Sequence, residues 1–179
     1  MPETLSRDCT VRLFADDTLL YMAITSPQDA QNMQNDLDKI PEWEKTWDMQ
    51  FHPDKCVVLR VKNKLASNKP VYYLRGHQLR SVDSTMYLGI EISSDLRWSK
   101  HVVRLCKKAI RTIGFLKRNA NISSRSIKEP AYKSLVRPQV EYASPVWDPS
   151  THVDINRVEM VHRHTTGYVC NRFNNNVQC

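Results

Sequence analysis

Two adjacent carboxylates, Asp16 and Asp17, stand between two short apolar runs in the stretch RLFADDTLLY, residues 12–21. Aspartate is a favoured turn residue because its side chain accepts hydrogen bonds from nearby backbone N–H groups. Two carboxylates that converge on one point also form a hard, oxygen-rich and negative site of the kind that binds Mg²⁺. The dipeptide alone leaves both interpretations open, and a surface turn is the commoner one, so the flanking residues must decide between them.

The residues around the Asp pair predict two short strands with the pair at the turn between them. Val11, Leu13 and Ala15 occupy alternate positions before the turn, and Thr18–Ile24 is rich in β-branched and aromatic residues. Both patterns are typical of strands. A hairpin of this kind would present the two carboxylates outward on a rigid support.

A helix is predicted after this hairpin. Ser26 suits an N-cap, Pro27 suits the first helical position, and Asp29 would complement the helix dipole. Pro41 should kink or end this helix, and residues 42–49 would then resume it. The opposite face is acidic and amidic, so the helix should pack on one side only. Its apolar stripe consists of Ala30, Met33, Leu37 and Ile40.

Residues 51–92 contain short apolar runs, KCVVLRV, VYYLRG and STMYLGIEI, between polar turns. We expect short strands here, and several strands around one amphipathic helix make a small α+β layer. From about Asp95 the spacing becomes helical. The first of these helices should bury Trp98, Val102, Leu105 or Cys106, Ala109, Ile113 and Leu116, and expose Lys100, Arg104, Lys107, Lys108 and Arg111.

Two more helices should follow. Ser123 or Ser124 could cap the second helix, and the third should span about residues 154–170. Proline removes a backbone hydrogen bond, so Pro130 and Pro138 should kink or interrupt the second helix. The side chains that the second helix should bury are Ile127, Ala131, Leu135 and Val136.

The charge is distributed unevenly along the chain. Residues 1–60 carry six Lys or Arg against eleven Asp or Glu, and residues 61–179 carry twenty against eight, which gives the net charge of +7. Between Arg97 and Lys128 there are ten basic residues and no acidic one. A merely solvated face normally mixes both signs, so the pattern favours an acidic part that attracts cations and a basic part that attracts nucleic acid.

Several classes of protein are disfavoured by the composition. No apolar stretch reaches the roughly 18 residues of a membrane span, and residues 1–10 are too polar for a signal peptide. An intracellular location, in the nucleus, the cytoplasm or both, is therefore expected, without a membrane partner. Five widely spaced cysteines without a C-x-x-C pair argue against a disulfide framework and a zinc finger.

The segment Phe-Ala-Asp-Asp (14–17) resembles the catalytic hairpin in the palm domain of reverse transcriptases, in the version found in non-LTR (LINE-type) retrotransposons. Further segments resemble later parts of the same family in the right order, and the resemblance covers nearly the whole chain from about residue 10. These segments are WDMQFHPDKC (47–56), YLGIEI (87–92), LRWSKHV (96–102), KKAIRTIGFLKRN (107–119), AYKSLVRPQVEYASPVW (131–147) and INRVEMVHRHTTGYV (155–169).

The resemblance implies a fold and two domains. It implies an α+β chain in which residues 1–93 form part of the palm, with antiparallel strands and one amphipathic helix. Residues 94–179 would form an all-helical thumb and the start of a C-terminal extension. The implied partners are an RNA template and a DNA primer, with deoxynucleotides bound only by the complete enzyme.

The resemblance also implies roles for individual residues around the metal. Asp16 would be a direct ligand of Mg²⁺ and Asp17 a second, less directly coordinating carboxylate, with Phe14 packed beneath them. Two Mg²⁺ ions would act in the complete enzyme. Lys55 would approach the leaving pyrophosphate, where a cation offsets developing negative charge.

Other residues of the resemblance would handle the nucleic acid. Tyr87, Leu88 and Gly89 would position the end of the primer. Basic residues of the long helix would contact the sugar–phosphate backbone of the RNA–DNA hybrid without reading its sequence. They are Lys100, Arg104, Lys107, Lys108, Arg111, Lys117 and Arg118.

The sequence departs from the family at several points. His52 stands where the family usually has Asn, and Pro41 and Pro130 interrupt helices that normally run more smoothly. His162 and His164 precede two cysteines, Cys170 and Cys179, but the spacing fits no common zinc site, so surface histidines are expected.

The two-metal mechanism requires a further carboxylate from another strand, which in this family lies well upstream of the Asp pair. Only 15 residues precede Asp16 in this sequence, and neither Asp8 nor Glu3 is a credible substitute. The sequence therefore predicts a palm-plus-thumb fragment of an RNA-directed DNA polymerase that is inactive as an isolated chain. Two alternatives stay open. One is a non-enzymatic nucleic-acid-binding or interaction protein derived from the element, and the other is a Mg²⁺-dependent phosphoryl-transfer enzyme that gains the missing carboxylate from a partner chain.

Overall fold

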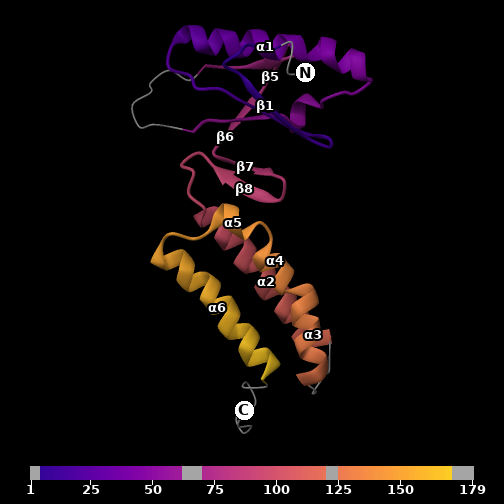
Figure 1. The fold of residues 1–179 in the computed structure, drawn as a ribbon, viewed down its shortest axis with the longest axis vertical. Helices are drawn as coiled ribbons and strands as arrows, with labels where there is room; N and C mark the ends of the chain where they lie inside the picture. The colour runs from indigo at the N-terminus through magenta and orange to yellow at the C-terminus, as the bar shows by residue number, and fades with distance from the viewer. Residues whose placement is uncertain (1–4, 62–69, 120–124, 171–179) are drawn as a thin grey trace. The chain divides into compact units, whose positions relative to one another are not determined.

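A computed structural model of the chain describes residues 5–61, 70–119 and 125–170. The chain forms two compact units (Figure 1). The first unit comprises Met1–Gly89 and Ser93–Leu96, and the second comprises Ile90–Ile92 and Arg97–Cys179. The mixture of helices and strands confirms the α+β class.

The first unit contains short strands in separate pairs. β1 (Thr10–Phe14) pairs antiparallel with β2 (Asp17–Tyr21), and β4 (Tyr73–Leu74) pairs antiparallel with β5 (His77–Gln78). The pairing of β3 (Val57–Leu59) with β6 (Arg80–Val82) is parallel, which differs from the purely antiparallel strands that the sequence predicts. The connection between them is long enough for a parallel crossover, since it includes the β4–β5 hairpin. β7 (Ser84–Tyr87) also belongs to the first unit, whereas most of β8 (Ile90–Ser93) belongs to the second.

The α-helix that the structure describes in the first unit is α1 (Pro27–Trp47). Its start is confirmed, because Ser26 and Asp29 form a reciprocal capping box in which each side chain accepts the other's backbone N–H, at 3.2 and 2.7 Å. Hydrogen bonds from Thr25 and Ser26 lower the pKa of Asp29 to about 2. Pro41 is predicted to kink or end this helix, and the predicted end is wrong: α1 runs through Pro41, since packing of the helix outweighs the loss of one backbone hydrogen bond.

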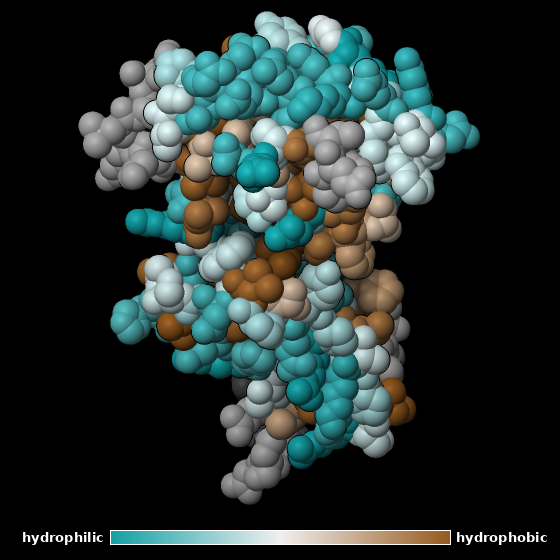
Figure 2. Space-filling view, turned by 45° about the horizontal axis from the view of Figure 1, so that its top comes forward, coloured by the Kyte–Doolittle hydropathy of each residue, from teal (hydrophilic) through white to brown (hydrophobic). Residues whose placement is uncertain are grey.

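The core of the first unit lies between α1 and the strands. It consists of Ile40, Tyr72, Leu74 and Leu79, and partly buried side chains such as Met33 and Leu37 surround it. The outer surface of α1 is almost uniformly hydrophilic (Figure 2). These observations confirm that an apolar stripe of α1 faces the strands.

Two carboxylates of α1, Asp36 and Glu44, are also buried. The prediction that α1 packs through a single apolar face did not include them. Asp36 is 1 % exposed and accepts hydrogen bonds from the backbone N–H and the hydroxyl of Ser6, at 3.0 and 2.5 Å, and from Lys39 at 2.9 Å. Burial, together with the nearby Asp36 carboxylate, raises the pKa of Cys9 to about 11. Asp36 therefore anchors the segment before β1 to the middle of α1.

The second unit is built mainly from helices. They are α2 (Ser99–Asn119), α3 (Arg125–Leu135), α4 (Arg137–Glu141), α5 (Ser144–Trp147) and α6 (His152–Val169). In Figure 1, α2 and α6 run side by side, and α2 also contacts α3 and α4. The buried stripe of α2 is confirmed: Val102, Leu105, Cys106, Ala109, Ile113 and Leu116 all belong to the core.

The predicted buried face of the helix after α2 is confirmed only in part: Val136 belongs to the core and Ala131 packs against it. Ile127 and Leu135 are exposed, whereas Lys128 is buried with its ammonium 5.2 Å from the centroid of the Tyr168 ring. This cation–π contact explains how a lysine replaces the predicted apolar residue in the interior. Pro130 is predicted to kink or interrupt this helix; it lies inside α3 without ending it, so the second alternative, an interruption, is wrong.

Other boundaries of the second unit agree better with the sequence. Pro138 lies in the first turn of α4 and so separates that helix from α3 as expected. The third predicted helix is α6, and Thr151 caps it by accepting the N–H of Asp154 at 3.2 Å. The predicted caps Ser123 and Ser124 lie outside the described residues. Within the ranges that the structure describes, no helix is both long and apolar enough to cross a membrane.

Candidate functional site

The predicted hairpin around the Asp pair is present. In the β1–β2 register Phe14 lies opposite Asp17, so Ala15 and Asp16 form a two-residue loop. Asp16 is at the tip and Asp17 is the first residue of β2, and both side chains are exposed. Ala15 has φ of 51°, in the left-handed region that costs a residue with a Cβ about 1–2 kcal/mol. The tight loop therefore presents two carboxylates next to a strained backbone position.

The chemistry of this turn suits Mg²⁺. Both side chains offer carboxylate oxygens, and polymerase-type sites commonly hold Mg²⁺ through one or two carboxylates and the phosphates of the substrate. The ranges that the structure describes contain no group of three or more His, Cys, Asp or Glu placed to hold a metal. Asp16 and Asp17 therefore supply donors of the right type, and the remaining ligands of such a site would come from elsewhere.

The surroundings of the turn correct one expectation. Phe14 is 63 % exposed, so the prediction that it packs beneath the carboxylates is wrong for this chain. Leu13 is also exposed, and Ala15 belongs to the loop. Leu20 of the hairpin packs against the core that the structure describes in the first unit.

Lys55 lies in a different loop of the first unit. It ends a short 3₁₀ turn, Pro53–Lys55, and its side chain is exposed. Its backbone N–H donates to His52 at 3.0 Å. In the part of the chain that the structure describes, Lys55 forms no ion pair or hydrogen bond with Asp16 or Asp17, so its predicted catalytic role stays a prediction.

The loop that carries Lys55 is anchored to α1 by a buried carboxylate. Glu44 is 2 % exposed, accepts the backbone N–H of Phe51 at 2.6 Å and forms an ion pair with Arg75. The Phe51 ring also stacks on Trp43 with centroids 6.0 Å apart. The side chain and the backbone of Phe51 are thus both fixed, four residues before Lys55. No sequence pattern points to Glu44 beyond its place on the helix.

Tyr87, Leu88 and Gly89 lie at the end of β7 and in the turn that follows it. Tyr87 is the last residue of β7. Leu88 and Gly89 have φ of 47° and 79°, so two successive residues adopt left-handed conformations. The second of these is well suited to glycine, which lacks the Cβ that disfavours positive φ. The predicted contact of these residues with a primer stays a prediction.

The basic face of α2 is present as the spacing predicts. Lys100, Arg104, Lys107, Arg111 and Arg118 are all exposed and follow one another at helical spacing, opposite the buried stripe. We refer to these five residues as the basic row. Lys108 and Lys117 are exposed beside it, and α2 contains no acidic residue. Such a surface attracts a polyanion along the whole length of the helix.

Two buried polar residues support α2, and the sequence analysis missed both. His101 is 4 % exposed; its Nδ1 accepts the backbone N–H of Glu91 at 3.2 Å, and its ring lies 5.4 Å from that of Trp147. Burial lowers the pKa of His101; Arg104 adds to this and Glu91 opposes it. Asp154 at the start of α6 is the second. His101 lies three residues after the predicted core residue Trp98, and Asp154 lies three residues after the cap Thr151. These spacings are the only feature of the sequence that points to the two residues.

The histidines near the end of α6 show no sign of a metal site. His162 and His164 are exposed, and neither belongs to a metal-holding group within the described ranges. Cys179 lies outside the described residues. The expectation of surface histidines is confirmed.

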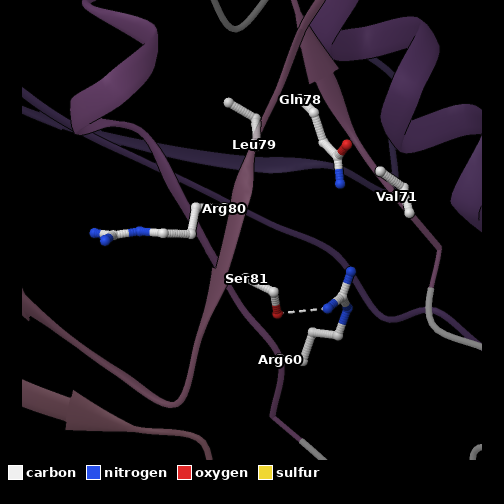
Figure 3. Close-up of a pocket in the computed structure, with 6 residues that line it drawn as sticks. All are labelled: Arg60, Val71, Gln78, Leu79, Arg80 and Ser81. Atoms are coloured by element: carbon white, nitrogen blue, oxygen red, sulfur yellow. Dashed lines mark hydrogen bonds between the residues drawn. The ribbon is translucent and has the colours of Figure 1, made fainter.

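The first unit also contains an open pocket of about 540 Å³ (Figure 3). Arg60 donates a 2.5 Å hydrogen bond to the hydroxyl of Ser81 and a second one to the carbonyl of Pro70. In Figure 3, Arg80 points away from Arg60. None of the site residues predicted from the sequence lines this pocket, whose walls are Arg60, Val71, Gln78, Leu79, Arg80 and Ser81.

Comparison with curated proteins shows similarity to polymerases of mobile elements. The chain is 26 % identical over 168 residues to the RNA-directed DNA polymerase from mobile element jockey of Drosophila melanogaster, which covers 91 % of this chain. It is 23 % identical over 155 residues to the jockey polymerase of Drosophila funebris, and 23 % identical over 163 residues to a probable RNA-directed DNA polymerase from transposon BS of Drosophila melanogaster. These matches confirm the resemblance to retrotransposon reverse transcriptases.

The matched proteins are much longer than this chain, which spans only 18 %, 17 % and 18 % of their respective lengths. No protein-family model matches the chain. No solved structure matches it either, so the assignment of palm and thumb stays a prediction.

Proposed function

We propose that the chain is a segment of an RNA-directed DNA polymerase from a non-LTR retrotransposon, in which residues 1–93 belong to the palm and residues 94–179 to the thumb. The observation that carries this proposal is the similarity to such polymerases along 91 % of the chain. At 91 % coverage the matched length includes the basic row. The proposal also accounts for the exposed Asp pair, the second chemically unusual feature of the sequence.

Asp16 and Asp17 are proposed to hold Mg²⁺ at the tip of the β1–β2 hairpin. Bound Mg²⁺ would stabilise the developing charge of a nucleotidyl transfer by Lewis-acid chemistry. The chain's own contribution is to fix two carboxylates on a short loop between paired strands, so that they need no reorganisation when they bind. Lys55 is proposed to place a positive charge near the departing phosphates.

The second unit is proposed to hold the RNA–DNA hybrid through the basic row of α2. Each lysine or arginine that neutralises a phosphate releases a counterion, so binding should weaken steeply as salt rises. Filter binding of an RNA–DNA hybrid tests this step. Undetectable binding at low salt, or binding that does not fall with salt, would contradict it.

A third carboxylate is required for the full reaction, and we propose that another segment of the longer polymerase supplies it. These 179 residues alone should then fail to extend a primer on an RNA template, whereas the chain combined with an upstream polymerase segment should extend it. Incorporation by the chain alone would overturn the requirement for that second segment.

One alternative function has a specific observation in its favour. The helical unit has its own core and carries the basic row, so it has the features of a nucleic-acid-binding module that needs no catalysis. Under that alternative, Asp16→Ala would leave every activity of the protein unchanged. If Asp16→Ala abolishes primer extension by the two-segment enzyme, which is the chain combined with the upstream polymerase segment, that result favours the polymerase.

A further inference from the structure

Gly114 lies inside α2, where glycine is unfavourable. A glycine in a helix interior costs about 1 kcal/mol relative to alanine, so its presence in a long helix calls for a reason. Packing against the described residues does not provide one. Apart from the helix backbone and the adjacent residues Ile113 and Phe115, a Cβ built at Gly114 would come within 4 Å of a single described atom, Nη1 of Arg118 at 3.3 Å. That atom ends a flexible side chain that can move aside.

The position of Gly114 on the helix is the second observation. It follows Arg111 by three residues and precedes Arg118 by four, and side chains at these spacings lie on the same face. Gly114 therefore takes the one step of the basic row that carries no side chain, beside the exposed Phe115, which follows Arg111 by four residues. At a rise of about 1.5 Å per residue, Arg111 and Arg118 are about 10 Å apart along the axis.

We propose that Gly114 is the point at which the sugar–phosphate backbone of a bound nucleic acid approaches α2 most closely, between Arg111 and Arg118. This inference rests on the proposed binding of nucleic acid by the basic row. Glycine permits close approach of a ligand to the backbone because it has no Cβ. The two flanking guanidinium groups lie one turn away on either side and neutralise the phosphates on each side of the contact.

The arrangement of Arg118 agrees with this assignment. In the unbound chain its guanidinium lies over Gly114. On binding, the guanidinium moves from the glycine to a phosphate, which exposes the backbone at the moment the polyanion arrives. A bulkier residue at position 114 would keep both the guanidinium and the phosphate farther from the helix.

Gly114→Ala tests the proposal because it should change stability and binding in opposite directions. Alanine should raise the melting temperature of the chain, since it is the better helix former. The same substitution should weaken binding of an RNA–DNA hybrid at low salt several-fold, and Gly114→Leu should weaken it further. The matched control is Ser134→Ala on the exposed side of α3, which also improves helix propensity and should leave binding unchanged.

Lys107→Ala separates the failure of this inference from the failure of the proposed function. If Lys107→Ala weakens binding and reduces its salt dependence while Gly114→Ala binds as tightly as the unsubstituted chain, the role of Gly114 is overturned alone. If neither substitution affects binding, the basic row is not the interface, and both proposals fail. Weaker binding by both variants, with a raised melting temperature for Gly114→Ala, supports both.

Discussion

The hydroxyl of Ser99 donates a 2.5 Å hydrogen bond to the carboxylate of Asp154 and so joins the first turn of α2 to the first turn of α6. Asp154 is 3 % exposed and also accepts hydrogen bonds from Thr151 at 2.8 Å and from Arg157 at 2.6 Å. Burial alone would raise the pKa of Asp154, but these three hydrogen bonds outweigh it and hold that pKa below its usual value. The helix that carries the basic row is therefore fixed at its start by a buried carboxylate of α6.

Asp154→Ala should destabilise the chain by about 2 kcal/mol, because it leaves hydrogen-bond donors of Ser99, Thr151 and Arg157 without their charged acceptor. Urea unfolding followed by far-ultraviolet circular dichroism measures the change. Asp154→Asn keeps a hydrogen-bond acceptor in the same place and should lose less stability than Asp154→Ala. Equal stability of Asp154→Ala and the unsubstituted chain would show that the cluster does not hold the two helices together.

His101 should make the stability of the chain depend on pH. Because burial lowers its pKa from 6.5, the unfolded chain takes up the proton more readily than the folded one. The stability that His101 contributes is complete above pH 6.5 and falls as the pH drops from 6.5 toward the lower pKa of the folded state. His101→Gln stays neutral, so urea unfolding at a series of pH values should show a smaller loss in this window. An identical loss in both chains would refute the assignment.

Ala15→Gly should relieve strain next to the Asp pair. The left-handed backbone at φ 51° disfavours alanine, while glycine adopts it without a penalty but loses more entropy on folding. The two effects leave an expected gain of up to about 1 kcal/mol in the free energy of unfolding. Ala23→Gly, at an exposed position without a positive φ, is the matched control and should destabilise the chain. The prediction fails if both substitutions destabilise it equally.

Glu44→Ala should release the loop that carries Lys55. The substitution leaves the N–H of Phe51 and the guanidinium of Arg75 without their partner, so unfolding should become easier by about 3 kcal/mol. Amide hydrogen exchange at Phe51 should accelerate more than exchange at Asp29, whose N–H is hydrogen-bonded to the N-cap Ser26 of α1. Glu44→Gln retains an acceptor and should protect the Phe51 amide better than alanine does. Unchanged exchange at Phe51 would contradict the anchoring role of Glu44.

The features that the sequence predicted correctly depend on local spacing. The strands around Asp16, the cap at Ser26 and the buried stripe that ends at Leu116 follow from residues a few positions apart. The errors at Pro41 and Pro130 have the opposite origin. Packing of the whole helix decided those positions, and a local rule for proline does not include it.

The buried polar residues could not be predicted because their partners are distant in the sequence. Asp36 is satisfied by Ser6, and Glu44 by Arg75, both about thirty residues away. For the candidate site, the sequence located the turn of Asp16 correctly but misplaced Phe14, whose exposure depends on which segments cover the hairpin. Spacing along one strand does not carry that information.

Primer extension by a two-segment enzyme tests the central claim most directly. The chain would be combined with a separately produced upstream segment of a jockey-type polymerase, an RNA template, a DNA primer, deoxynucleotides and Mg²⁺. Asp16→Asn should abolish incorporation, whereas Asp38→Asn, the same change at an exposed position of α1, should leave it intact. Incorporation that survives Asp16→Asn would contradict the assignment of the β1–β2 turn as the metal-binding turn of a polymerase.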